Sequence, residues 1–129
     1  MQNRKNYTTG AKWESIVGYS RAVRIGQTIE VSGTVAIEDG RVHGINDPYL
    51  QAKKILEIIV SAVESLGGKK SDIIRTRTYV INIRDWEAVG KAHGEVFKDV
   101  MPATSLVGIS ALIAPEYLVE IEATAIVSA

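Results

Sequence analysis

The stretch Val119-Glu-Ile-Glu-Ala-Thr-Ala125 alternates between apolar and polar residues along its whole length. Successive side chains of a β-strand point to opposite faces of a sheet. The apolar residues of this stretch therefore share one face, and Glu120, Glu122 and Thr124 share the other. The pattern predicts a strand over residues 117–127 that covers a hydrophobic core with one face and presents a polar surface with the other.

Two amphipathic helices are predicted earlier in the chain. Asp47 suits the N-cap of the first helix, and Pro48 suits its first helical position. Apolar residues then recur at helical spacing over residues 52–66. The pair Gly67-Gly68 is predicted to end this helix, because glycine readily adopts the left-handed conformation of a helix C-terminus.

The second helix is predicted to begin at Asp85, as its N-cap, and to end before Pro102. Residues 1–17 are polar and are predicted to be irregular. The other strands are predicted at residues 22–25, 28–32, 34–37, 73–83 and 104–112.

The predicted order of elements is β-β-β-α-β-α-β-β. Two helices must then cover one face of a mixed sheet, which makes an α+β fold. The strand at 73–83 adds Arg75, Arg77 and Tyr79 to the polar surface. A face of this kind is either wet or paired with another subunit, and we favour pairing because a small chain gains stability by burying it. The length of 129 residues predicts a single domain over 1–129.

The composition argues against several classes of function. Fifteen basic and fifteen acidic residues give a net charge of zero, whereas nucleic-acid binders usually carry a basic excess. The absence of cysteine excludes thiolate nucleophiles and cysteine-bound zinc. No apolar run approaches the length of a membrane span, and no secretory signal is evident. We therefore expect a cytoplasmic protein that binds neither nucleic acid nor a membrane.

Several short motifs occur in the order and at the spacing of a known family. They are the segment 18–26 with Val31-Ser32-Gly33, Gln51, the Leu-Gly-Gly turn at 66–68, Asp72-Ile-Ile74 with Tyr79-Val80, Pro102-Ala103-x-Ser105, and Val119-Glu-Ile-Glu-Ala123. Together they resemble the RidA/YjgF family, also known as the endoribonuclease L-PSP family, from about Val17 to Val127.

The resemblance implies a chorismate-mutase-like fold and a homotrimer with small-molecule clefts between adjacent subunits. The best-known activity of the family is hydrolysis of reactive enamines and imines derived from amino acids, without a cofactor or metal. In the family, an arginine of a Pro-Ala-Arg-Ser motif holds the substrate carboxylate. A glutamate on the last strand and a tyrosine near the start position the attacking water.

This sequence has only some of the residues of the family's site. Glu120 and Tyr19 match the glutamate and the tyrosine, which makes them the candidate catalytic residues. Ser32, with Gly33 beside it, matches a ligand-binding serine. Thr104 stands in the place of the arginine. In addition, Leu106 replaces a frequent pocket cysteine and Gly90 replaces a frequent asparagine.

The replacement at Thr104 bears most directly on function. Loss of a charge-assisted pair with the ligand costs about 2–5 kcal/mol of binding, or roughly 30- to several-thousand-fold. The usual amino-acid-derived imines are therefore poor candidate substrates. Arg21 is a candidate replacement anchor, and a solvated surface arginine is the alternative interpretation.

Alternatives exist for the other residues too. Glu120 is either a general base or a partner of Arg75 or Arg77 across the sheet. Tyr19 either lines a cleft or packs under the N-terminal segment. His93 is expected to be a satisfied core or interface residue, and it forms no metal site with His43.

Three functions follow from these considerations. The first is a hydrolase or deaminase acting on a small reactive metabolite. The second is a non-catalytic trimer that binds a metabolite or a partner protein. The third, an endoribonuclease or translation inhibitor, is disfavoured by the neutral charge and by an aromatic content of 6%.

Overall fold

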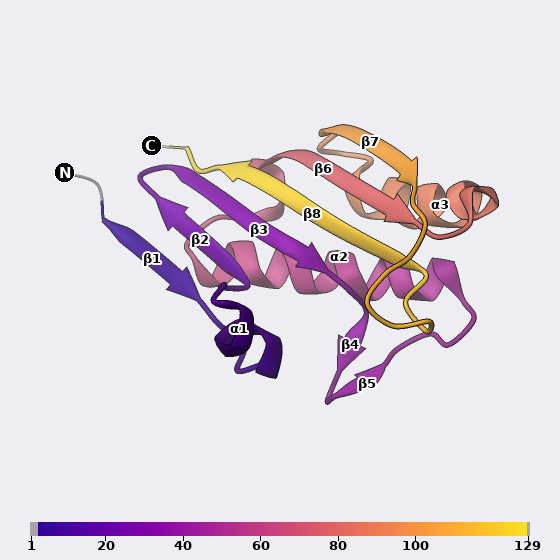
Figure 1. Cartoon of the computed structure of the whole chain (residues 1–129). Helices are drawn as coiled ribbons and strands as arrows, with labels where there is room; N and C mark the ends of the chain where they lie inside the picture. Colours follow the sequence, from indigo (N-terminus) through magenta and orange to yellow (C-terminus); the bar gives the residue numbers. More distant parts are fainter. Residues whose placement is uncertain (1–2, 129) are drawn as a thin grey trace.

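The fold is built on one six-stranded sheet, seen in the computed structural model of the chain, which describes residues 3–128 (Figure 1). The strands lie in the order β1-β2-β3-β8-β6-β7. Their bounds are β1 Arg4–Tyr7, β2 Ala22–Ile25, β3 Thr28–Thr34, β6 Ile73–Val80, β7 Ala103–Gly108 and β8 Val119–Ile126. Neighbouring strands are antiparallel except β6 and β7, which are parallel.

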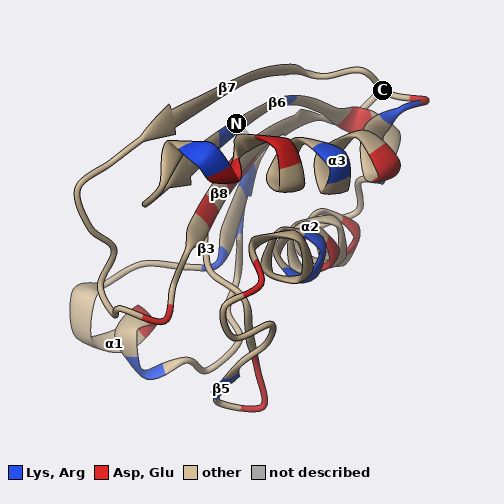
Figure 2. Ribbon diagram, turned by 90° about the vertical axis from the view of Figure 1, so that its right-hand side faces the viewer, with Lys and Arg blue, Asp and Glu red and all other residues tan. Residues whose placement is uncertain are grey.

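Both long helices lie on the same face of this sheet. They are α2 (Pro48–Ser65) and α3 (Trp86–Phe97), which pack side by side (Figure 2). The other elements are a short helix α1 (Lys12–Val17), a hairpin of β4 (Ile37–Glu38) and β5 (Arg41–Val42), and two 3-10 turns, Lys70–Asp72 and Ile83–Asp85. The predicted α+β class, with a mixed sheet and two helices on one face, is confirmed.

Strand β8 has the two faces that its sequence predicts. Its apolar residues Val119, Ile121, Ala123 and Ala125 are almost fully buried and belong to the core beneath α2. Glu120 points to the open face and is only partly buried. The strand lies between β3 and β6, so a polar residue on its open face is flanked by side chains from two neighbouring strands.

The caps of α2 are also as predicted. The Asp47 side chain accepts a hydrogen bond from the backbone N–H of Leu50 at 3.0 Å, and Pro48 takes the first helical position. At the other end, Gly67 has a φ of 89°. The N–H groups of Gly67 and Gly68 then donate to the carbonyl groups of Glu64 and Val63, which ends the helix.

The predicted irregular segment 1–17 is wrong in its described part, which contains β1 and α1. Strand β1 is a short polar edge strand, and its four residues lack the apolar alternation that would reveal it. Helix α1 has only six residues, too few for a helical period to show. Residues 1 and 2 lie outside the described range, as does residue 129 of the predicted single domain.

Several predicted boundaries are also wrong. The strands predicted at 73–83, 104–112 and 117–127 are shorter. Of the strand predicted at 34–37, residues 35–36 belong to no strand and Ile37 belongs to the β4–β5 hairpin. Asp85 makes no side-chain cap on α3. Instead, Asn82 accepts a hydrogen bond from the N–H of Arg84, which ends the extended chain after β6 and starts a 3-10 turn before the helix.

A buried glutamine fixes the chain just before β8. The Gln51 side chain is fully buried on α2. Its Nε2 donates to the carbonyl groups of Gly44 and Glu116 at 3.1 and 2.9 Å, and its Oε1 accepts from the N–H of Leu118 at 3.0 Å. One side chain therefore satisfies three backbone groups and fixes Leu118, the residue just before β8 and two residues before Glu120.

We expect Gln51→Leu to lower the free energy of unfolding by about 2–4 kcal/mol, because backbone groups would lose their partners in a part-buried setting. Denaturant titration measures this loss. Gln27→Leu, at an exposed turn, is the matched control and should change stability by less than about 0.5 kcal/mol. A loss below about 1 kcal/mol at Gln51 would show that water replaces the side chain.

Candidate functional site

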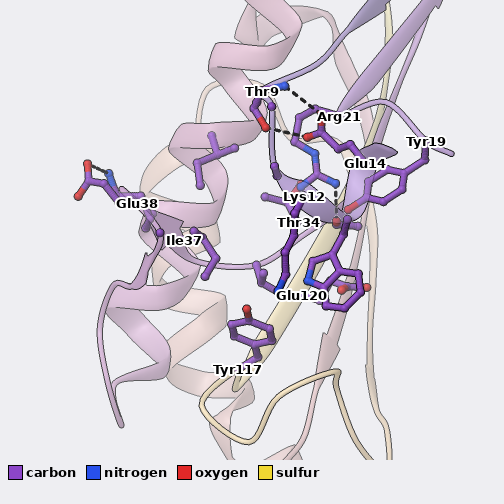
Figure 3. Close-up of a pocket in the computed structure, with 18 of the residues that line it drawn as sticks. Thr9, Lys12, Glu14, Tyr19, Arg21, Thr34, Ile37, Glu38, Tyr117 and Glu120 are labelled. Carbon is purple, nitrogen blue, oxygen red and sulfur yellow. Dashed lines mark hydrogen bonds and ion pairs between the residues drawn. The ribbon is translucent and has the colours of Figure 1, made fainter. Parts of the chain in front are cut away.

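A pocket of about 990 Å³ opens beside Glu120. Strand β8 contributes Glu120, the segment leading into β2 contributes Tyr19 and Arg21, and β3 contributes Gly33. Helix α1 also contributes to the lining, and its residues Lys12 and Glu14 are drawn among the pocket residues in Figure 3. Four of the predicted site residues, from three separate parts of the chain, therefore meet in one place.

The Glu120 carboxyl group lies directly against the backbone at Gly33. A Cβ atom built on Gly33 would be 2.6 Å from Oε2 of Glu120 and 2.8 Å from its Cδ. Any larger residue would thus displace the carboxyl group. The pairing of β3 with β8 is irregular between Val31 and Thr34, so this approach occurs at a local break in the ladder.

Burial raises the pKa of Glu120 above the usual glutamate range, and the negative charge of Glu122 raises it further. Arg21 acts in the opposite direction and more weakly. Within residues 3–128, Glu120 makes no hydrogen bond or ion pair through its side chain. A half-buried, unpaired carboxyl group is suited to proton transfer.

The alternative pairing of Glu120 with Arg75 or Arg77 is wrong. Arg77 lies 3.7 Å from Glu122, and Arg75 donates to the hydroxyl of Ser105 at 2.9 Å. Glu122 also accepts a hydrogen bond from the Tyr79 hydroxyl at 3.0 Å, which raises the pKa of that tyrosine. Glu122 therefore has the structural role on this face and leaves Glu120 free.

Arg21 is held firmly and is not a solvated surface residue. Its Nη2 donates to the carbonyl oxygen of Gly33 at 2.9 Å, and its guanidinium lies 5.6 Å from the centre of the Tyr19 ring. Its Nε is sealed from solvent without a hydrogen-bond partner among the described residues. Tyr19 is thus a wall of the pocket and a support for Arg21.

Ser32 is directed away from this pocket. Its hydroxyl donates to the carbonyl of Ser20 at 2.7 Å, while its N–H donates to the carbonyl of Arg21. These bonds hold β3 against the segment leading into β2. The sequence placed Ser32 among the ligand-binding residues, but in a single chain its side chain has a structural bond and does not line the pocket.

Thr104 does not join Glu120 within one chain. It pairs in register with Thr76 of β6, on the face covered by the helices. The Thr104 hydroxyl lies 2.7 Å from that of Thr76, which in turn lies 2.8 Å from Nε2 of His93. Leu106 lies on the same face of β7 and packs against the core. A cleft containing Thr104, Leu106 and Glu120 therefore requires a second chain.

His93 is partly buried and its Nε2 shares a hydrogen bond with the Thr76 hydroxyl, so it is satisfied within the chain. Burial lowers its pKa, and its ring packs against Phe97 with a centroid distance of 4.7 Å. Among residues 3–128, no three histidine, aspartate or glutamate side chains gather as metal ligands. None of the described helices has the length and hydropathy to cross a membrane.

The sequence analysis missed the contribution of α1 to the pocket. Trp13 and Lys12 line it, and the buried Glu14 fixes the helix by accepting hydrogen bonds from the N–H and hydroxyl of Thr9. Two local features of the sequence could have indicated this helix. They are Glu14, an acidic residue five positions after Thr9, and Gly18 at the helix end, where φ is 89°.

The arrangement can be compared with known proteins. The sequence model of the family named Endoribonuclease L-PSP matches residues 9–127. The chain belongs to this family. Solved structures of YjgF proteins agree, so this is also the RidA/YjgF family predicted from the motifs.

A YjgF-family protein from Mycobacterium tuberculosis is 42% identical, with a TM-score of 0.89 over 97% of this chain and 100% of its own. The Escherichia coli YjgF protein is 28% identical, with a TM-score of 0.82 over 95% and 98%. An uncharacterised Streptomyces coelicolor protein is 37% identical over 91% of this chain and 87% of its own. A 2-iminobutanoate/2-iminopropanoate deaminase from Dermatophagoides farinae is 28% identical over 73% and 74%.

The contact between Gly33 and Glu120 yields a test of the site geometry. In Gly33→Ala the new methyl group would push the Glu120 carboxyl group toward solvent, so we expect its raised pKa to fall toward the usual range. Stability should change by less than about 1 kcal/mol, since the end of a side chain can move aside. Carboxyl-carbon NMR titration measures the pKa.

Gly94→Ala on α3 is the matched control, because a Cβ there meets no other atom within 4 Å. It should leave the pKa of Glu120 unchanged and add up to about 1 kcal/mol of stability. An unchanged Glu120 titration in Gly33→Ala would mean that the carboxyl group does not depend on this approach.

Proposed function

We propose that the chain is a small-ligand protein of RidA type that hydrolyses a small reactive metabolite, with Glu120 as the general base. The observation that carries the proposal is the half-buried carboxyl group of Glu120, unpaired and held over Gly33 in a pocket of about 990 Å³. A base with a raised pKa is stronger once it is ionised. Deaminase names among the relatives agree with this reaction class.

In the proposed reaction, ionised Glu120 takes a proton from water and the hydroxide adds to the carbon of a C=N bond. The nitrogen receives the proton held by Glu120 and, through solvent, the proton of the added hydroxyl group. The C–N bond then breaks as the C=O bond forms, and the nitrogen leaves as ammonia. One imine and one water thus become one carbonyl compound and one ammonia. Tyr19 would position the water or the ligand beside Arg21.

The substrate should not be held at position 104 in the way that the family's arginine holds its 2-imino acids. Thr104 carries no charge, and its hydroxyl is already bonded to Thr76. The proposal includes a homotrimer, because Thr104 and Leu106 can join Glu120 only across a contact between two chains. Family resemblance supports this assembly, with ligand clefts between adjacent subunits.

The alternative is a non-catalytic trimer that binds a metabolite or a partner protein. The hydrogen bond of Thr104 to Thr76 favours it, since the position that should grip the substrate is instead satisfied inside its own chain. Endoribonuclease activity is disfavoured, because a neutral chain offers little attraction for phosphates.

Turnover of small imines, generated in situ from amines or amino acids, distinguishes catalysis from binding. We expect Glu120→Gln to lower kcat by roughly 10²–10⁴-fold. In the wild type, the rate should rise as the pH increases through the raised pKa of Glu120, because the base must be ionised. Unchanged turnover in Glu120→Gln would exclude Glu120 as the base.

Glu122→Gln is the matched control, on the same strand and face. It should retain turnover, but the rising limb of the pH–rate profile should move to lower pH, because Glu122 helps to raise the pKa of Glu120. A profile that does not move would contradict the electrostatic account of the site.

Substitution at Thr104 tests the missing carboxylate anchor. We expect Thr104→Arg to raise kcat/KM for amino-acid-derived imines by at least about tenfold, since a guanidinium binds a carboxylate through two donors. Thr104→Ala, which removes the bond to Thr76 without adding charge, should give no gain. An equal effect of the two variants would show that position 104 does not reach the substrate.

A further inference from the structure

Arg21 has hydrogen-bond donors that the fold does not use. Its Nη2 donates to Gly33, but its buried Nε has no partner among the described residues. Its Nη1 also donates to none of them, and it is not sealed from solvent as Nε is. Leaving guanidinium donors unpaired is costly, and a ligand in the pocket could supply an acceptor to Nη1, the donor that is not sealed from solvent.

Arg24, on the strand that follows Arg21, shows what a structural arginine does here. Its Nε donates to the carbonyl of Gly26 at 2.8 Å, and its Nη1 donates to the carbonyl of Leu66 at 2.7 Å. Arg24 thereby ties β2 to the end of α2. Arg21 makes one such bond and directs the rest of its guanidinium into the pocket beside Glu120.

The positive charge of Arg21 is also unmatched. No carboxylate oxygen of residues 3–128 lies within 4.0 Å of its guanidinium nitrogens. Glu14, in the same pocket, uses its two oxygens to accept from Thr9. Burial raises the pKa of Glu120 more than Arg21 lowers it, which extends the pH range in which Glu120 is neutral and does not repel an anion.

The wall around this charge is apolar. Trp13 and Val17 of α1 and Ile113 of the loop before β8 line the pocket, and they are 42%, 68% and 73% exposed. Large apolar side chains exposed together around a hollow indicate a ligand with an apolar body. Lys12 extends over the Trp13 ring at 5.0 Å and adds a second positive charge on the same side.

We propose that Arg21 is the anion anchor of this pocket and that its ligand is a small carboxylic acid whose apolar body packs on Trp13. A planar guanidinium matches the planar fork of a carboxylate better than it matches a tetrahedral anion. The inference deepens the proposed function, because it names the ligand class for the same pocket. It does not require that the ligand be turned over.

Calorimetric titration of the full chain with three probes of one shape tests the assignment. The probes are phenylacetate, its neutral amide phenylacetamide, and phenyl phosphate. We expect the wild type to prefer the carboxylate over the amide by at least about tenfold. Arg21→Gln should abolish this preference through a roughly 10- to 100-fold loss of carboxylate affinity, while the affinity for the amide persists.

Two further variants separate anchoring from support of the fold. Trp13→Ala should weaken carboxylate and amide by the same factor, because it removes apolar contact and no charge. Arg84→Gln, at an exposed arginine outside the pocket, should change neither affinity. If Arg21→Gln does not fold, Arg21→Lys serves in its place and should lower the preference for the carboxylate while retaining the amide.

Three results would overturn the proposal. The first is an equal loss of both affinities in the Arg21 variants, which would make Arg21 a support of the Gly33 bulge only. The second is tighter binding of phenyl phosphate than of phenylacetate. The third is no binding of any probe with a Kd below about 10 mM. Loss of turnover in Glu120→Gln with the carboxylate preference intact would support both proposals, whereas intact turnover would overturn the proposed function alone.

Discussion

The close approach of Glu120 to the backbone of Gly33 is the constraint on which the rest of the site depends. Because position 33 has no side chain, the carboxyl group can lie over the sheet instead of extending into water. That placement causes the burial which raises its pKa, and it leaves Arg21 bonded to the carbonyl of the same glycine. Acid, cation and pocket wall are thus arranged around one residue of β3, at the break in its pairing with β8.

The residues of the family motifs lie on both faces of the sheet. Tyr19, Arg21 and Glu120 line a pocket next to the open face, whereas Thr104 and Leu106 face the helices. The sequence cannot reveal this division, because it depends on the parallel register of β6 with β7. That register places Thr104 beside Thr76, where its hydroxyl finds a partner inside the chain. Thr104 is therefore an uncharged residue whose hydroxyl group is already hydrogen-bonded within its own chain.

Much of the architecture could be predicted from the sequence, because local chemistry determines it. Alternation revealed the faces of β8, and Asp47, Pro48 and Gly67 defined the ends of α2. The features that escaped prediction depend on contacts between distant segments or on elements too short to show a period. Helix α1 has six residues, and the hydrogen bonds that fix it come from Thr9. The sequence identified Glu120 as a site residue. It could not show that Glu120 is unpaired, because that depends on Arg77 pairing with Glu122 across the sheet.

Two groups in this pocket lower the stability of the folded state. Arg21 keeps a buried donor without a partner, and Glu120 keeps a carboxyl group out of water. Since the folded state holds the proton of Glu120 to higher pH than the unfolded chain does, folding loses stability as the pH rises from the ordinary glutamate pKa of 4.5 through the raised value. Arg24 lies three residues after Arg21, and Glu122 lies on the same strand as Glu120. Both make hydrogen bonds within the chain, so the same residue types can be satisfied in this part of the fold. The neighbours are satisfied and these two groups are not, among the described residues, which is the reason for proposing that a ligand supplies their partners, since perturbed groups cluster at functional sites.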